Sequence, residues 1–276
     1  APVTGLGSAD EPIVISFVPS GETAEITTGG EQIAELLGEE TGLAFESNVA
    51  TAYAAVIESM GAENTHVGFL NTFSYILAHE KHDVDVILVA ERFGSTTYQG
   101  QIITRADSGI ESIDDLRGVT FCRPDPLSTS GWIIPSVMLQ AEGLNPEEDL
   151  NIVDAGGHDG VVRSVYNEDC DAGATYVDAR GEVEEELTDV MDEVVVIATT
   201  DEIPNDNVSV IPELSDDLVQ TIRDGLLAML ETEAGQEAME TVYGIEALEP
   251  AEDTFYDEFR TTLDRAGVEI ETLTAE

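Results

Sequence analysis

The sequence predicts an α/β protein built from two lobes that each contain a sheet. Short apolar runs alternate with longer segments of helical periodicity, which is typical of βαβ units and a mainly parallel sheet. The alternation restarts after residue 108, so a second unit follows the first. The chain has 276 residues, 42% of them hydrophobic, which is enough for one large domain or two of ordinary size.

The expected elements follow in chain order. In the first unit we expect strands at 13–18, 43–49, 66–70, 84–89 and 98–104, with helices at 31–40, 53–60 and 73–80. In the second we expect a short helix at 109–118, strands at 119–122, 151–154, 172–176 and 194–198, and helices up to 141, at 159–167 and from 180. A short strand at 208–211 and a helical segment over 216–266 complete the chain. Ligands of such folds bind outside the carboxyl ends of the strands, in the crevice between lobes.

Carboxylates dominate the charge. There are 58 Asp and Glu against 10 Lys and Arg, a formal net charge of -48, and Lys81 is the only lysine. The acidic residues are spread along the chain, which indicates a solvated coat on a folded body. Like charges repel, so nucleic acid and anionic membranes are disfavoured as partners. The composition favours adaptation to high salt, with an ordinary acidic extracellular protein as the alternative.

No apolar run reaches the roughly 18 residues of a membrane span, and the first residues, from Ala1 to Gly5, do not form a charged leader or signal segment. A signal removed from a mature chain would give the same beginning. The two cysteines, Cys122 and Cys170, stand beside strand-like segments and outside any metal-ligand spacing. Neighbouring strands would bring them together as a disulfide, which we favour over two buried thiols and which implies an oxidising compartment.

Ser128-Thr129-Ser130-Gly131 is the most informative stretch of the chain. It follows turn residues and precedes an apolar run, and Pro135 requires the helix to begin near Gly131. Hydroxyls and free N–H groups at a helix N-terminus donate hydrogen bonds to an oxyanion. Ordinary capping needs one hydroxyl, and three in a row exceed that need. We therefore predict an anion site here.

His158 is a second candidate donor, because it follows a strand and two glycines at the start of a helix. A capping or surface histidine is an equal alternative from position alone. Tyr53 and Tyr98 stand near element starts, where core packing is the usual role of a tyrosine. Asp178 and Asp206 also stand where crevice residues are expected, although a solvated carboxylate is the simpler interpretation in so acidic a chain.

Enzyme signatures are poor. The sequence lacks GxSxG, a Walker loop, HExxH and a GxGxxG after a strand. A hydrolase that uses Ser130 as nucleophile with His158 remains the rival from another functional class. We expect no catalytic residue, no cofactor and no metal.

The motifs resemble a known family. Asp125 to Gly131 followed by Pro135 looks like the signature of the periplasmic phosphonate-, phosphite- and phosphate-binding proteins of ABC transporters, the phosphonate-binding PhnD-like family. Residues 51–60, residues 67–75 and Ala155 to His158 match further family segments, so the resemblance covers roughly the whole chain.

The resemblance implies a type II periplasmic-binding-protein fold whose two lobes close on the ligand about a two-strand hinge. Lobe one would comprise residues 1–104 with 207–276 and lobe two residues 105–206, with hinge strands near Thr104 and Asn207. The residues implied to bind the ligand come from both lobes: Tyr53, Tyr98, Ser128, Thr129, Ser130, His158, Asp178 and Asp206. The two aspartates fall where relatives hold an amino group. Asp178 is shorter than the glutamate of aminophosphonate binders, so it could accept a hydrogen bond from P–OH instead.

The resulting expectation is a monomeric solute receptor that delivers a phosphorus oxyanion to an ABC permease. It would be periplasmic or extracellular, either free or anchored through a removed segment. Phosphonate, phosphite and phosphate are the expected ligands. Sulfate or an organic phosphate is the alternative within the same fold. Neutral donors would hold the anion, while Asp178 and Asp206 would favour ligands that carry a donor of their own.

Overall fold

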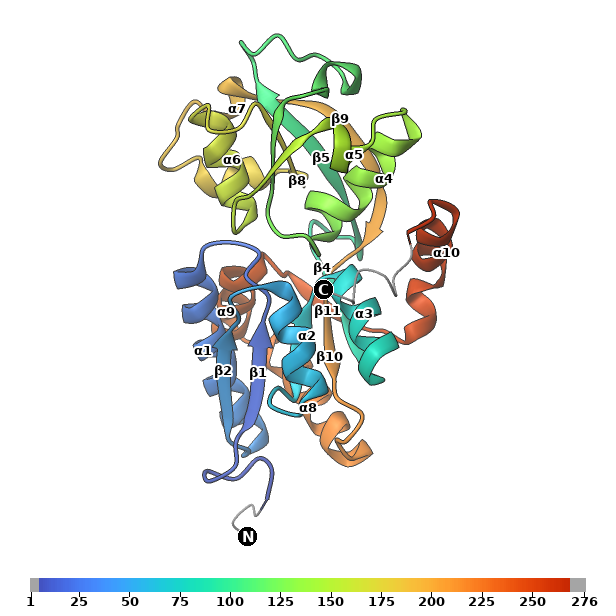
Figure 1. Cartoon of the computed structure of the whole chain (residues 1–276). Coiled ribbons are helices and arrows are strands. Elements are labelled where there is room, and N and C mark those ends of the chain that lie inside the picture. The colour runs from blue at the N-terminus through green and yellow to red at the C-terminus, as the bar shows by residue number, and fades with distance from the viewer. Residues whose placement is uncertain (1–4, 269–276) are drawn as a thin grey trace. The chain divides into compact units, whose positions relative to one another are not determined.

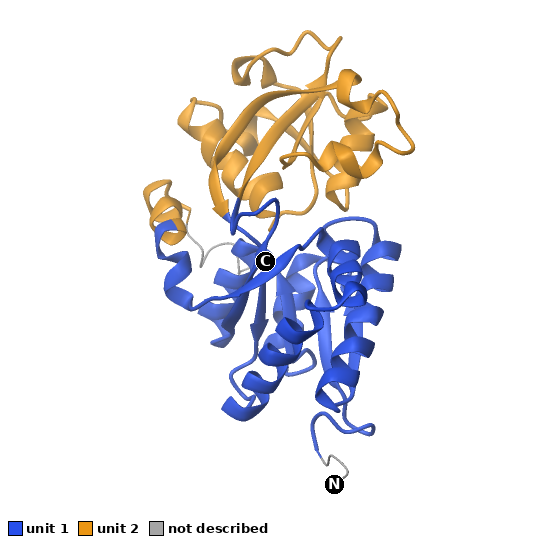
Figure 2. Cartoon of the chain, turned by 180° about the vertical axis from the view of Figure 1, so that it is seen from behind, with its two compact units in different colours: residues 1–97, 204–258 blue, residues 98–203, 259–276 orange. Residues whose placement is uncertain are grey.

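The computed structural model describes residues 5–268 and has the expected α/β architecture (Figure 1). Contacts divide the chain into two compact units (Figure 2). Unit 1 comprises the residues up to Thr97 together with Pro204–Glu258, and unit 2 comprises Tyr98–Ile203 and the chain from Phe259 onward. The chain therefore passes from one unit to the other after Thr97, after Ile203 and after Glu258. Residues 100–104 pair with 172–176 inside the sheet of unit 2, which assigns this stretch to that unit.

Unit 1 is built on a six-stranded sheet of order β11-β4-β10-β3-β1-β2. Its strands and main helices are β1 (Ile13–Phe17), α1 (Thr23–Thr41), β2 (Phe45–Val49), α2 (Tyr53–Gly61), β3 (Val67–Leu70), α3 (Thr72–His82), β4 (Asp85–Glu91), β10 (Asn207–Val210), α8 (Asp216–Met229), α9 (Glu233–Tyr243) and β11 (Ala247–Pro250). β1 pairs in parallel with both β2 and β3. Right-handed crossovers in opposite directions place α1 and α2 on opposite faces, and α1 packs with α8 and α9 while α2 packs with α3.

Helix α1 begins eight residues earlier than the sequence suggested, at Thr23 instead of residue 31. The run Thr27-Thr28-Gly29-Gly30 is a poor helix former, yet the glycines are required by packing. A Cβ at Gly29 would lie 2.6 Å from a methyl of Val242, and one at Gly30 would lie 2.8 Å from the Phe17 ring. Close approach of α1 to α9 and to β1 therefore overrides local propensity.

Unit 2 is built on a five-stranded sheet of order β7-β6-β8-β5-β9. Its main elements are β5 (Thr97–Arg105), β6 (Thr120–Arg123), the π-helical turn η2 (Thr129–Ile133), α4 (Ile134–Ala141), α5 (Pro146–Asp149), β7 (Asn151–Asp154), α6 (His158–Tyr166), β8 (Ala172–Tyr176), the 3₁₀ turn η3 (Ala179–Val183), α7 (Val190–Glu193) and β9 (Val194–Pro204). β6 pairs in parallel with β7 and β8, whereas β5 is antiparallel to β8. Helix α10 (Asp257–Arg265) ends the described chain.

Both sheets are thus mixed. The strands that follow βα connections are parallel, while β10 runs antiparallel to β3 and β4 and β5 runs antiparallel to β8. These strands lie beside the crossings after Thr97 and Ile203, so they enter their sheets without a crossover helix. β11 was missed within the expected helical tail, and it pairs antiparallel with β4. Within the described chain, the membrane-span criteria of length and hydropathy are met by none of the helices.

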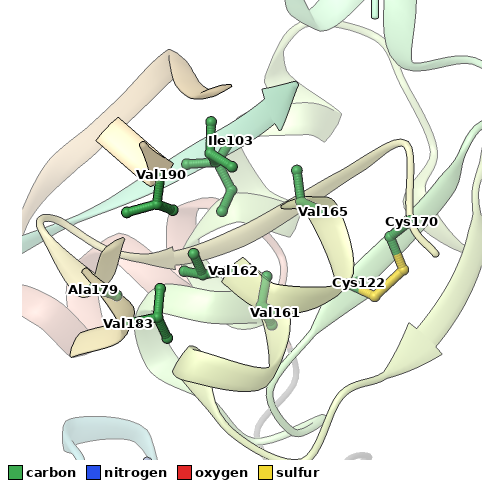
Figure 3. Close-up of a cluster of buried hydrophobic side chains, with 10 residues drawn as sticks. Ile103, Cys122, Val161, Val162, Val165, Cys170, Ala179, Val183 and Val190 are labelled. Atoms are coloured by element: carbon green, nitrogen blue, oxygen red, sulfur yellow. A yellow bond between two sulfur atoms is a disulfide. The ribbon is translucent and has the colours of Figure 1, made fainter. Parts of the chain in front are cut away.

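The disulfide expected between Cys122 and Cys170 is present and belongs to the core of unit 2 (Figure 3). It joins β6 to the segment that enters β8. Val161, Val162 and Val165 of α6 are fully buried in the same cluster. Helix α6 therefore lies on the β6–β8 pair, and the loops that follow β6 and precede α6 are both tied to this core.

Candidate functional site

The loop that carries the three hydroxyls begins with a tight turn after β6. The Asp125 carboxylate accepts from the Leu127 N–H at 2.7 Å, and the Asp125 carbonyl accepts from the Ser128 N–H at 3.0 Å. Gly131 packs on Pro124 so closely that a Cβ there would lie 2.3 Å from the proline Cδ. Glycine is therefore needed for this loop geometry, which the sequence could not specify.

The helix begins at Thr129 with Ser128 as its N-cap, two residues earlier than expected. The Ser128 hydroxyl accepts from the Gly131 N–H at 3.2 Å, and its carbonyl accepts from the N–H groups of Trp132 and Ile133, both at 3.0 Å. The first N–H groups of any helix have no intrahelical acceptor. Ser128, Thr129 and Ser130 are each 1% exposed. Buried hydroxyls and helix-end N–H groups thus gather at one point, as an anion site requires.

His158 lies beside this loop. It is the first residue of α6, it is 4% exposed, and its Nε2 lies 3.4 Å from the Ser128 Oγ. The other ring nitrogen, Nδ1, lies 2.7 Å from the Thr175 Oγ1 and receives the Tyr176 backbone N–H at 3.4 Å. A backbone N–H can only donate, so Nδ1 accepts and the ring proton of the neutral imidazole is on Nε2. His158 therefore presents a donor on the side of the Ser128 loop.

Thr175 is a site residue that the sequence analysis missed. It is fully buried in β8, and its hydroxyl fixes the orientation of the His158 ring. The sequence signal for Thr175 was a hydroxyl residue within the apolar strand Ala172–Tyr176. This signal is not distinctive, because threonine is common in strands. The Tyr176 ring packs edge-on against the imidazole, with centroids 4.8 Å apart, and its hydroxyl donates to Glu182.

Two other predicted residues of unit 2 lie at the neighbouring end of the sheet. Tyr98 is half-buried near the start of β5, and Asp178 is exposed in the left-handed conformation just after β8, with φ 71°. The Val177 N–H donates to the Gln99 carbonyl, which places Tyr98 and Asp178 at the same end of their paired strands.

The loop has no cationic side chain of its own. The sequence holds no Lys or Arg between Arg123 and Arg163. Arg123 is engaged elsewhere, because its Nε lies 2.6 Å from Asp154 and its guanidinium stacks 4.5 Å from the centre of the Trp132 ring. The groups that this loop offers to an anion are therefore neutral donors and the positive end of a helix dipole. In the described residues 5–268, Cys, His, Asp and Glu form no cluster suited to a metal ion.

Unit 1 carries the remaining predicted residues at the edge of its sheet where β1, β2 and β3 end. Tyr53 is the first residue of α2 and is 1% exposed. Asn71 caps α3, its side chain accepting from the Ser74 N–H at 2.9 Å. Asn207, at the start of β10, pairs with Leu70 at the end of β3, so Asp206 reaches the same edge.

Asp206 is held by Arg92, a partner that the sequence analysis missed. The Arg92 Nη1 lies 3.8 Å from the Asp206 Oδ2, and the two side chains are only 11% and 16% exposed. Burial raises the pKa of Asp206 to about 6, although the Arg92 charge opposes that rise. The Asp206 carboxylate thus has a charged partner within unit 1, where the sequence analysis considered only a ligand or solvent.

The other histidines have structural or partly exposed surroundings. His66 Nδ1 accepts from the Val14 N–H at 2.9 Å, and burial lowers the pKa of His66. His79 and His82 are partly exposed on α3 beside carboxylates.

A comparison with protein families matches residues 15–256 to the model described as "ABC transporter, phosphonate, periplasmic substrate-binding protein". The Phosphate-import protein PhnD of Mycolicibacterium smegmatis is 30% identical over 177 residues, which are 60% of this chain and 55% of that protein. The Phosphonates-binding periplasmic protein of Escherichia coli is 24% identical over 170 residues, 60% of this chain and 50% of that protein. The matches span about half the length of these curated relatives.

Solved structures give the same fold. The binding protein component of an ABC phosphonate transporter from Pseudomonas aeruginosa has a TM-score of 0.85 at 17% identity, covering 92% of this chain and 86% of that one. PhnD1 from Prochlorococcus marinus, solved in complex with methylphosphonate, has a TM-score of 0.83 at 12% identity, covering 93% and 98%. These likenesses confirm a type II periplasmic-binding-protein fold.

Proposed function

Since the chain belongs to the phosphonate-binding family of ABC-transporter periplasmic substrate-binding proteins, we propose that it captures a phosphorus oxyanion and delivers it to a membrane permease. The ligand class comprises phosphonate, phosphite and phosphate. The observation that carries the proposal is the buried donor set of unit 2, in which the Ser128 loop meets the Nε2–H of His158. Each charge-assisted hydrogen bond to such a ligand contributes roughly 1.5–3 kcal/mol.

The eight residues expected to bind the ligand divide between the units. Ser128, Thr129, Ser130 and His158 are the strongest candidates, because the structure brings them together. Tyr98 and Asp178 share the adjoining end of the sheet of unit 2, and Tyr53 and Asp206 belong to unit 1. We propose that capture involves closure of the two units about the crossings after Thr97 and Ile203, with the protein acting as a monomer outside the cytoplasmic membrane, anchored or free.

The geometry argues against the hydrolase alternative. The hydroxyl near His158 is that of Ser128 and not that of Ser130. The ring nitrogen facing it carries the proton, so it cannot take a proton from serine as a general base must. An imidazole donor beside a hydroxyl donor suits binding better than nucleophilic catalysis.

The experiment is a binding panel with methylphosphonate, phosphite, inorganic phosphate and sulfate, measured by titration calorimetry in high salt. We expect heat from at least one phosphorus compound and weaker binding of sulfate. Stabilisation by sulfate alone would favour the other anion receptor of this fold, and no binding of any phosphorus compound would refute the proposal. Turnover of a phosphate or acyl ester that disappears in Ser130→Ala would establish the hydrolase instead.

A further inference from the structure

Gln101 of β5 has an unusual environment for a polar side chain. The residue is only 1% exposed, and its buried amide nitrogen Nε2 has no acceptor among the described residues. A buried amide left without a hydrogen bond is destabilising, and such groups are uncommon in folded proteins. The Gln101 amide is therefore a candidate for an acceptor supplied from outside the chain.

The position of Gln101 in the sheet puts it next to Thr175, the hydrogen-bond partner of His158. Gln101 pairs directly with Thr175 of the antiparallel strand β8. Residues directly opposite each other share a face of the sheet, with Cβ atoms about 4.5–5.5 Å apart. The Thr175 hydroxyl is bonded to His158, so Gln101 lies on the face that α6 covers, at the level of this bond.

The preceding residue, Gly100, faces the other side and touches the hydroxyl loop. A Cβ at Gly100 would lie 2.7 Å from the Ser130 carbonyl oxygen. The start of β5 therefore lies beside the Ser128 loop on one face and beside Thr175 on the other. Gly100 lies against the Ser130 backbone, and Gln101 lies opposite Thr175.

Gln99 provides an internal comparison, because it lies on the same face of the same strand. Its Nε2 donates to the Thr200 carbonyl at 2.8 Å, and the residue is exposed. The sheet thus satisfies the amide that lies near solvent and leaves the buried one unsatisfied. The polar character of the strand alone therefore does not account for the unsatisfied amide of Gln101.

We infer that the side-chain amide of Gln101 donates a hydrogen bond to the oxyanion bound in unit 2. The inference rests on the proposed function and extends its donor set beyond the hydroxyls and the imidazole. A neutral amide suits this site, since it adds a donor without adding a charge that must be buried. Gln101 would then also help to exclude ligands that lack an oxygen acceptor at that position.

The test compares Gln101→Met with wild type and with Gln99→Met as the matched control. Methionine keeps a similar shape without polar atoms, so a structural role alone predicts an unchanged or higher melting temperature and unchanged binding. For a ligand-binding role we expect the Kd for methylphosphonate or inorganic phosphate to rise about tenfold or more in Gln101→Met. Gln99→Met should leave the Kd within about twofold of wild type. A Kd for Gln101→Met within that same range would overturn the inference.

A second measurement uses the wild-type protein, so it does not depend on whether a variant folds. The side-chain ¹H–¹⁵N amide resonances of Gln101 should shift when methylphosphonate is added to the wild-type protein, and those of Gln99 should not. Unmoved Gln101 resonances in a protein that binds the probe would overturn the role of Gln101 alone. A wild-type protein that binds neither methylphosphonate nor phosphate would overturn the proposed function and this inference with it.

Discussion

Loss of the disulfide between Cys122 and Cys170 should lower the free energy of unfolding of unit 2 by about 4 kcal/mol. The bond closes a loop with a sequence separation of 48 residues. The chain-entropy relation for a loop of that length gives about 14 cal/mol/K, which is about 4 kcal/mol at 25 °C. This is a large share of the roughly 5–15 kcal/mol that stabilises a typical domain.

The assay is guanidinium unfolding followed by circular dichroism, with and without a reductant. The reduced wild-type protein is the best comparison because it keeps every side chain and loses only the covalent bond. The double variant Cys122→Ala/Cys170→Ala should unfold at a still lower midpoint, since it also loses two buried sulfur atoms. A drop below about 1 kcal/mol on reduction would refute the loop-entropy argument.

The same perturbation should weaken ligand binding. The bond joins β6, which leads into the Ser128 loop, to the segment that enters β8 and carries Thr175. Without the bond, the Ser128 loop and the segment that carries Thr175 have more conformational freedom. Ligand binding must then immobilise their side chains, at a cost of about 0.5–1.5 kcal/mol for each one. We expect the Kd for methylphosphonate to rise severalfold in the reduced protein. Equal Kd values in the two redox states would show that the donors are positioned without the bond.

Three further perturbations address the site and its charge. Ser128→Ala removes the helix cap and one ligand donor, so we expect a loss of about 1 kcal/mol in stability and a Kd for methylphosphonate at least about tenfold higher by calorimetry. Thr175→Val releases Nδ1 of His158 and should raise the same Kd about three- to tenfold, whereas Thr175→Ser should restore it. Asp206 should titrate near pH 6 in ¹³C carboxyl spectra, with Arg92→Met raising that value because a favourable charge is removed. Because the pKa of Asp206 is raised in the fold, ionisation works against folding: its contribution to stability is complete below about pH 4 and declines by about 3 kcal/mol as pH rises through 6.

Each of these expectations has a control. Thr221→Ala, an exposed hydroxyl on α8, should change neither Kd nor stability by a measurable amount. If Thr175→Ser binds methylphosphonate no more tightly than Thr175→Val, then the methyl group of threonine matters and the hydroxyl does not. The linkage argument would be contradicted if the free energy of unfolding of Asp206→Asn fell as steeply with pH as that of wild type between pH 4 and 7.

The sequence identified the parts of the fold and site that depend on local chemistry. The hydroxyl triplet, His158 and the two cysteines were found because each departs from the residue types expected at its position. Helix α1 was shortened in the prediction because Gly29 and Gly30 are poor helix formers, and only their contacts with Val242 and Phe17 explain them.

Partners from distant segments could not be predicted. Thr175 acts through His158, 17 residues away along the chain, and a hydroxyl residue in a strand carries no mark of that role. Arg92 and Asp206 meet because β4 and β10 pair, a long-range choice that periodicity does not specify. The orphaned nitrogen of Gln101 is likewise invisible until the register of β5 against β8 is known.

The single tryptophan gives the Ser128 loop its own optical reporter. Trp132 lies in the turn η2 two residues after Ser130, is 6% exposed, and has the Arg123 guanidinium over its ring. Indole emission depends on nearby charge and solvent, so excitation at the red edge of the absorption band observes this loop and no other part of the protein. Ligand arrival, its rate and its salt dependence can therefore be followed by fluorescence in the unlabelled protein.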